Sequence, residues 1–265
     1  MKGKQLLSVL AGAFGLTLIL ITIMHPTVLY AGAALPAEQV TQGGTIPTTV
    51  VLTPTKDNTL YESATGNLSN GAGAYFFAGK TAGGNIRRGL VAFAVADQVP
   101  TGATIVSATL QLRMSKTAGG AAAITLHRAL GDWGEGASNA DLNEGSGVTA
   151  TAGDATWLHT FYDTATWQTP GGDFVPTATA TVAVSSITTY HWTSPAWVAD
   201  VQQWLDNPNS NFGWLILGDE SAARTAKRFD ASENPTPASR PQLTIIYTVA
   251  TTETMAVYLP LIQKE

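Results

Sequence analysis

Tryptophans are the residues of this 265-residue chain best suited to contact a ligand, and there are seven of them. An indole ring offers a flat apolar face, so an exposed one can stack on a sugar ring. Four stand in or beside segments expected to be loops, where functional residues concentrate. They are Trp133, Trp157, Trp167 and Trp192. The other three lie in apolar stretches and are expected in the core: Trp197, Trp204 and Trp214.

Basic side chains on or beside neighbouring expected strands suggest a second kind of contact. A guanidinium group is a planar fork that holds a carboxylate through two parallel hydrogen bonds. An anionic polysaccharide could therefore bind at Arg88, Arg113 and Arg128, with Arg87 and Lys116 beside them. The net charge of the whole chain opposes the binding of a polyanion, because 14 basic and 19 acidic residues give a net charge of −5. Only a local basic patch would attract a polyanion, and scattered solvated charges are the alternative interpretation.

Carboxylates near expected strand ends suggest one structural calcium ion. Calcium takes oxygen ligands from irregular segments, and the predicted ligands are Asp57, Asp219, Asp230 and Glu233. Capping of turns by these side chains is the alternative. The loop from Asn139 to Asn143 imitates the first ligand spacing of an EF-hand, but Glu144 stands where that motif needs glycine.

Catalytic constellations are not recognisable in the sequence. His127, His159 and His191 are isolated, and neither a His-Glu-x-x-His motif nor a Gly-x-Ser-x-Gly motif occurs. There is no cysteine to serve as a nucleophile or thiolate ligand. We therefore predict no enzyme activity. A polysaccharide lyase is the least favoured alternative, since Tyr162 near His159 could abstract a proton.

Alternating apolar residues predict the sheets that position these groups. From Val106 to Met114 every second residue is apolar and the residues between are polar, which gives a strand with one buried face. Such a face needs a second layer over it. One helix is expected after Ser194-Pro195, with apolar residues at helical spacing from Trp197 to Leu205. About eight strands and one short helix predict an all-β, antiparallel sandwich of the jelly-roll type.

The chain is expected to divide into four segments. Residues 1–33 combine Lys2 and Lys4 with an apolar run and the small residues Ala31-Gly32-Ala33, which is typical of a signal peptide. The run is also long enough for an uncleaved anchor, which would be the protein's one contact with a membrane. Residues 34–47 are expected as a linker, 48–249 as the sandwich and 250–265 as a tail. We predict a secreted or cell-surface location and, without a run of Lys and Arg, no nucleic-acid partner.

Eight stretches resemble the DNRLRE-type domain of secreted bacterial and archaeal proteins, in the same order along residues 50–248. They are Arg88–Phe93, Val99–Leu112, Trp133–Gly136, Trp167–Phe174, Val201–Leu205, Asn211–Trp214, Phe229–Asn234 and Arg240–Tyr247. The resemblance implies a β-sandwich module, and related modules bind acidic polysaccharides such as alginate. One departure is Phe93-Ala94-Val95, where the family usually has Phe-Asp-Leu.

Two functions remain open on the sequence. The loop tryptophans and the resemblance favour a non-catalytic extracellular module that binds a cell-surface or matrix polysaccharide. The low charge and the lack of an attached catalytic domain favour a structural or adhesive module of a surface protein without a small ligand. A glycan array would separate the two.

Overall fold

The computed structural model describes residues 38–257, of which Thr41–Thr254 form the larger compact unit. The predicted signal peptide or anchor and residues 258–265 of the predicted tail lie outside the described residues, whereas residues 250–257 of that tail continue the last strand. Between residues 38 and 257, no helix is both long and apolar enough to cross a membrane.

Eleven strands form one large, curled, mostly antiparallel sheet. The order is β1-β15-β6-β14-β4-β5-β13-β7-β11, with β12 on β6 and β2 on β5. Their bounds are β1 Glu38–Leu52, β2 Lys56–Tyr61, β4 Tyr75–Lys80, β5 Ile86–Ala92, β6 Thr104–Thr117, β7 Ala122–Arg128, β11 Ala180–Val184, β12 Thr188–Trp192, β13 Trp214–Leu217, β14 Lys227–Asp230 and β15 Gln242–Val257.

Short elements complete the described chain. They are β3 Leu68–Ser69, β8 Val148–Thr149, β9 His159–Phe161, β10 Ala165–Thr166, α1 Val95–Gln98, α2 Pro195–Asp206, and the 3-10 turns η1 Asp141–Ser146, η2 Pro208–Ser210 and η3 Pro237–Ser239. In the described part α2 is the one helix of seven or more residues. The predicted all-β, antiparallel, sandwich-like fold with one helix is confirmed.

Strand β4 joins the two layers of the sheet. Its first four residues, Tyr75 to Ala78, pair with β14, whereas Gly79 and Lys80 pair with β5. Gly79 has a φ of +110°, and a Cβ atom there would lie 2.9 Å from the carbonyl oxygen of Thr225. Because only glycine adopts this backbone without strain, Gly79 lets the strand pass from one layer to the other.

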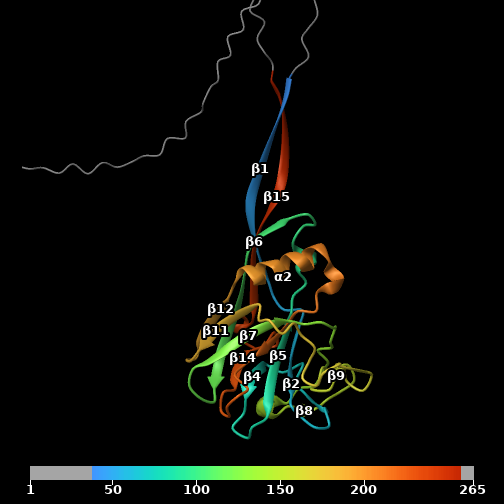
Figure 1. Cartoon of the computed structure of the whole chain (residues 1–265), viewed down its shortest axis with the longest axis vertical. Helices are drawn as coiled ribbons and strands as arrows, with labels where there is room; N and C mark the ends of the chain where they lie inside the picture. Colours follow the sequence, from blue (N-terminus) through green and yellow to red (C-terminus); the bar gives the residue numbers. More distant parts are fainter. Residues whose placement is uncertain (1–37, 258–265) are drawn as a thin grey trace, which may run out of the picture. The chain divides into compact units, whose positions relative to one another are not determined.

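The main core lies between the layers and is closed by α2, which runs across the strands in Figure 1. Ser194 caps the helix by accepting a hydrogen bond from the Trp197 backbone amide. Trp197 stacks on Trp214 with ring centroids 3.6 Å apart, and Phe76 stacks on Phe229 at 5.6 Å. The inward residues of β6 that the alternation predicted, from Ala108 to Met114, are fully buried.

A second apolar cluster covers the outer face of the layer built from β2, β5 and β13. Leu60, Leu90 and Leu215 belong to these strands and pack with Trp133, Trp157 and Trp167 from the long connection after β7. This layer is therefore buried on both faces. The layer of β6, β14 and β4 carries partly exposed polar residues on its outer face, so that face is not covered in the same way.

The predicted linker needs one correction. Residues 38–47 belong to β1, which lies beside β15 in the sheet. The Thr251 hydroxyl donates to the Gly44 carbonyl oxygen at 2.9 Å. Pairing with a distant strand holds this segment extended, and such a partner cannot be read from the local sequence.

Candidate functional site

The four loop tryptophans are buried, with exposed fractions of 1% for Trp133, 9% for Trp157, 5% for Trp167 and 0% for Trp192. The indole nitrogens of three of them donate to backbone carbonyls. Trp133 bonds to Phe212, Trp167 to Thr156 and Trp192 to Ile124. The prediction that these rings are exposed platforms for a sugar is wrong, because the connection that carries the first three folds back onto the sheet and Trp192 points into the core.

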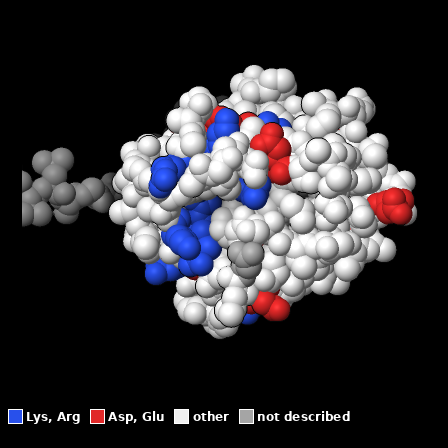
Figure 2. Space-filling model, turned by 90° about the horizontal axis from the view of Figure 1, so that it is seen from below, with Lys and Arg blue, Asp and Glu red and all other residues white. Residues whose placement is uncertain are grey.

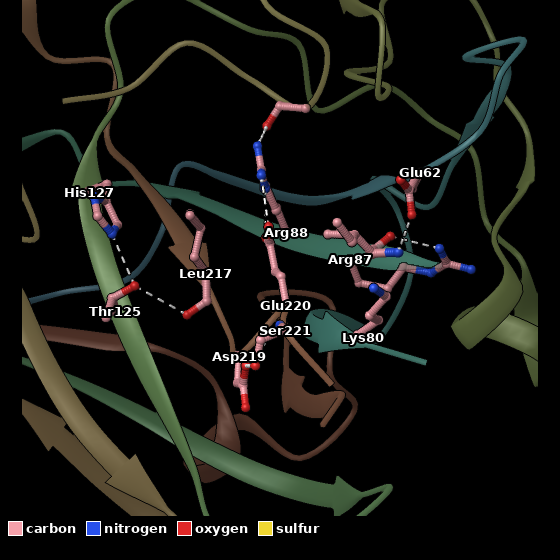
Figure 3. Close-up of polar contacts among 12 residues, drawn as sticks. Glu62, Lys80, Arg87, Arg88, Thr125, His127, Leu217, Asp219, Glu220 and Ser221 are labelled. Atoms are coloured by element: carbon pink, nitrogen blue, oxygen red, sulfur yellow. Dashed lines mark hydrogen bonds and ion pairs between the residues drawn. The ribbon is translucent and has the colours of Figure 1, made fainter. Parts of the chain in front are cut away.

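Arg88 and Arg128 are occupied by partners within the chain. The guanidinium group of Arg88 donates to both carboxylate oxygens of Glu220, at 2.8 and 2.9 Å, and to the Gly171 carbonyl oxygen (Figure 3). Arg128 lies 3.6 Å from an Asp200 carboxylate oxygen and donates to the Gln203 side chain. Both arginines tie separate segments together, so they are poor candidates for ligand contacts.

The four predicted calcium ligands do not come together. The Asp219 carboxylate accepts from the backbone amide and hydroxyl of Ser221 (Figure 3). The Asp230 carboxylate faces Arg113, with 3.6 Å between Oδ2 and Nε. Asp57 is buried and accepts a hydrogen bond from the Ser232 amide. Across residues 38–257, no group of three or more His, Asp and Glu side chains is placed to hold a metal ion.

Asp57 and Glu233 are nevertheless close enough to influence each other, together with Glu135, which the prediction did not include. Burial raises the pKa of the Asp57 carboxyl well above its usual range, and the charge of Glu233 raises it further. Burial also raises the pKa of Glu135 to about 7. The Asp57 backbone amide donates to Glu135 Oε1 at 2.8 Å, so this carboxylate joins the start of the long connection to β2.

A groove crosses the open layer where β4, β14 and β6 lie side by side, and we call it the basic groove. It consists of two cavities, of about 490 and 160 Å³. Both cavities are lined by Phe77, Lys116, Gly145 and Arg228. Figure 2 shows lysine and arginine side chains gathered on one side of this end of the molecule. Two other cavities have only Lys56 and Asp97 as charged lining residues.

Strand register places the cations of the basic groove. Arg228 in β14 is paired with Lys116 in β6 and with Phe77 in β4. The Arg228 guanidinium carbon lies 3.7 Å from the centroid of the Tyr75 ring, and its Nε donates to the Ser115 hydroxyl at 3.0 Å. These contacts hold the guanidinium group over the sheet in one orientation.

Two further basic residues of the groove are less accessible. Arg87 is 5% exposed, lies over the Tyr61 ring and donates to the carbonyl oxygens of Ile86 and Gly145. Lys227 is fully buried, donates to Thr117, Gly119 and Gly120, and has a pKa lowered by burial. Lys116 is exposed and Arg228 half-buried, so these two are the cations that a ligand meets first.

The turn η1 forms the opposite wall of the groove. The Glu144 carboxylate accepts from the Asn70 side chain and the Tyr75 amide, at 3.0 and 2.8 Å. Burial raises the pKa of Glu144. The Tyr61 hydroxyl donates to the Glu144 carbonyl oxygen at 2.6 Å. Anchored in this way, η1 presents the fully exposed Leu142 beside the groove.

Of the predicted basic residues, Arg87 and Lys116 line the basic groove, and Arg113 lies on the open layer outside it, beside Asp230. Tyr75, Arg228 and Leu142 were not predicted. The local signal for Arg228 was its alternation with the inward Lys227 and Phe229, but its neighbours follow from pairings with strands more than 100 residues away. The chain matches no protein-family model and no curated protein.

Proposed function

We propose that this protein is a non-catalytic, extracellular carbohydrate-binding module that holds a cell-surface or matrix polysaccharide in the basic groove. The observation that carries the proposal is the arrangement of Lys116 and Arg228 beside Tyr75, Phe77 and Leu142 in one open groove. The resemblance to DNRLRE-type domains agrees with a module of this kind.

The groove combines the two properties that an acidic sugar requires. Its cations pair with carboxylates through charge-assisted hydrogen bonds, and its apolar residues pack against the C–H face of a sugar ring. Because the ion pairs would form at the surface, binding should weaken as salt screens the charges. The acidic composition of the whole chain does not oppose this, since a local patch dominates at short range.

A binding experiment tests the proposal on residues 34–265. The purified protein is titrated with a panel of acidic and neutral polysaccharides at low and at physiological salt. We expect the double variant Lys116→Ala/Arg228→Gln to lose at least tenfold in affinity for acidic chains. Arg128→Gln is the matched control, because Arg128 is paired outside the groove, and it should bind as the unaltered protein does. No binding across the panel would contradict the proposal.

A structural or adhesive module without a small ligand is the second candidate. It is favoured by the burial of every predicted loop tryptophan and by the internal pairing of Arg88 and Arg128. The polysaccharide lyase has less support. His159 and Tyr162 pack edge to face, with ring centroids 5.2 Å apart, but neither lines the basic groove. A lyase predicts unsaturated products from uronate polymers, which absorb in the ultraviolet.

A further inference from the structure

Charge is distributed unevenly along the basic groove. The smaller cavity is lined by Arg87, Lys116 and Arg228, and no acidic residue lines it. The larger cavity shares Lys116 and Arg228 but is also lined by Asp141 and Glu144. The groove therefore has a cationic end and an end where cations and carboxylates are mixed.

The two carboxylates at the mixed end differ in their surroundings. Glu144 is only 8% exposed, and its carboxylate already accepts two hydrogen bonds. Asp141 is exposed at the start of η1, with a φ of +49°. The exposed carboxylate is the one that a ligand in the larger cavity meets.

An acidic ligand responds differently to the two ends. A carboxylate at the cationic end gains charge-assisted hydrogen bonds. A second carboxylate on the next sugar, at the mixed end, is placed near Asp141, and like charges brought together in an interface are disfavoured. Neutral sugar hydroxyls instead donate to a carboxylate, which is an acceptor only.

We propose that the basic groove prefers a polysaccharide in which acidic sugars alternate with neutral sugars over an unbroken polyuronate. The acidic sugar meets Lys116 and Arg228 at the cationic end, where the buried Arg87 adds positive charge, and the neutral sugar lies beside Asp141 and Leu142. This inference rests on the proposed carbohydrate-binding function and specifies the order of sugars that the site accepts.

The test compares two oligosaccharides of equal length by calorimetry at one salt concentration. One alternates glucuronate with N-acetylglucosamine, and the other is an oligomannuronate. We expect the unaltered protein to bind the alternating chain about tenfold more tightly. Asp141→Asn should bring this ratio close to one by improving affinity for the oligomannuronate, whereas Lys116→Ala should weaken both.

Asp163→Asn is the matched control. Asp163 is also exposed, has a φ of +61° and does not line the groove, so the same change of charge there should leave the ratio as it was. Equal or tighter binding of the oligomannuronate by the unaltered protein, or a ratio that Asp141→Asn does not change, would overturn the inference while leaving carbohydrate binding intact. Binding of neither chain would overturn the inference as well, while carbohydrate binding itself is contradicted only when nothing binds across the whole polysaccharide panel.

Discussion

The guanidinium group of Arg228 lies over the ring of Tyr75, with 3.7 Å between the guanidinium carbon and the ring centroid. Tyr75 comes from β4 and Arg228 from β14, and the two strands are paired in register. The Arg228 side chain is thus oriented by an aromatic face and the Ser115 hydroxyl rather than by a carboxylate, which leaves its charge available to an anionic ligand.

Removal of this ring should weaken ligand binding without unfolding the protein. We expect Tyr75→Ala to lower the affinity for an acidic polysaccharide about two- to fivefold, because an exposed cation–π contact contributes about 0.5–1 kcal/mol. Tyr75→Phe keeps the ring and should bind normally. Calorimetry on both variants checks this, and equal loss in both would assign the effect to the hydroxyl.

Glu144 should make the stability of the fold depend on pH. Its pKa is raised in the folded protein by burial, so ionisation costs the folded state more than the unfolded state. The contribution to stability is fully present below the usual glutamate pKa and is lost as pH rises through the folded pKa. Glutamine at position 144 does not ionise. The unfolding free energy of the Glu144→Gln variant should therefore fall less steeply with rising pH than that of the unaltered protein. Urea unfolding at a series of pH values measures both slopes, and parallel curves would contradict the expectation.

Gly79 should be intolerant of a side chain. We expect Gly79→Ala to destabilise the fold by about 2–4 kcal/mol, because it combines a left-handed backbone with a Cβ atom 2.9 Å from the Thr225 carbonyl oxygen. Gly84→Ala is the matched control, since Gly84 has a φ of +87° and open space around it. It should cost about 1–2 kcal/mol. Chemical denaturation of both variants separates the cost of the backbone conformation from the cost of the contact with Thr225. Equal losses of unfolding free energy in the two variants would show that this contact costs nothing.

One structural calcium ion stays a prediction of the sequence with a direct test. A bound ion stabilises the folded state by mass action, so a chelator should lower the melting temperature and added calcium should restore it. Magnesium serves as the control, because it demands a smaller and more regular set of ligands. The same melting temperature with and without chelator would contradict the prediction.

The sequence predicted those parts of the fold that local patterns encode. The alternation in β6 and the Ser194 cap with its apolar helical spacing both gave the observed elements. Residues 95–98 form the short helix α1, which the sequence did not indicate, because a short apolar pattern does not distinguish a helix from a strand.

The candidate site depended on contacts that local patterns do not carry. Trp133 is buried through a bond to Phe212, 79 residues away, and Arg88 is paired with Glu220, 132 residues away. Nothing near either residue in sequence indicates these partners. The alternation of β6 placed Arg113 correctly on the open face. Lys116 reaches that face only because the β6–β14 register shifts between Arg228 and Phe229, and Arg228 itself required the register between β14 and two other strands.

The basic groove and the tryptophan cluster lie on different layers of the sheet, so substitutions in one affect folding stability differently from substitutions in the other. Lys116 and Arg228 point outward, while their inward neighbours Met114 and Phe229 fill the core. Substitutions in the groove should therefore alter the proposed ligand preference with little loss of folding stability. The face beneath Trp133, Trp157 and Trp167 offers no such freedom, since every change there also repacks the interior.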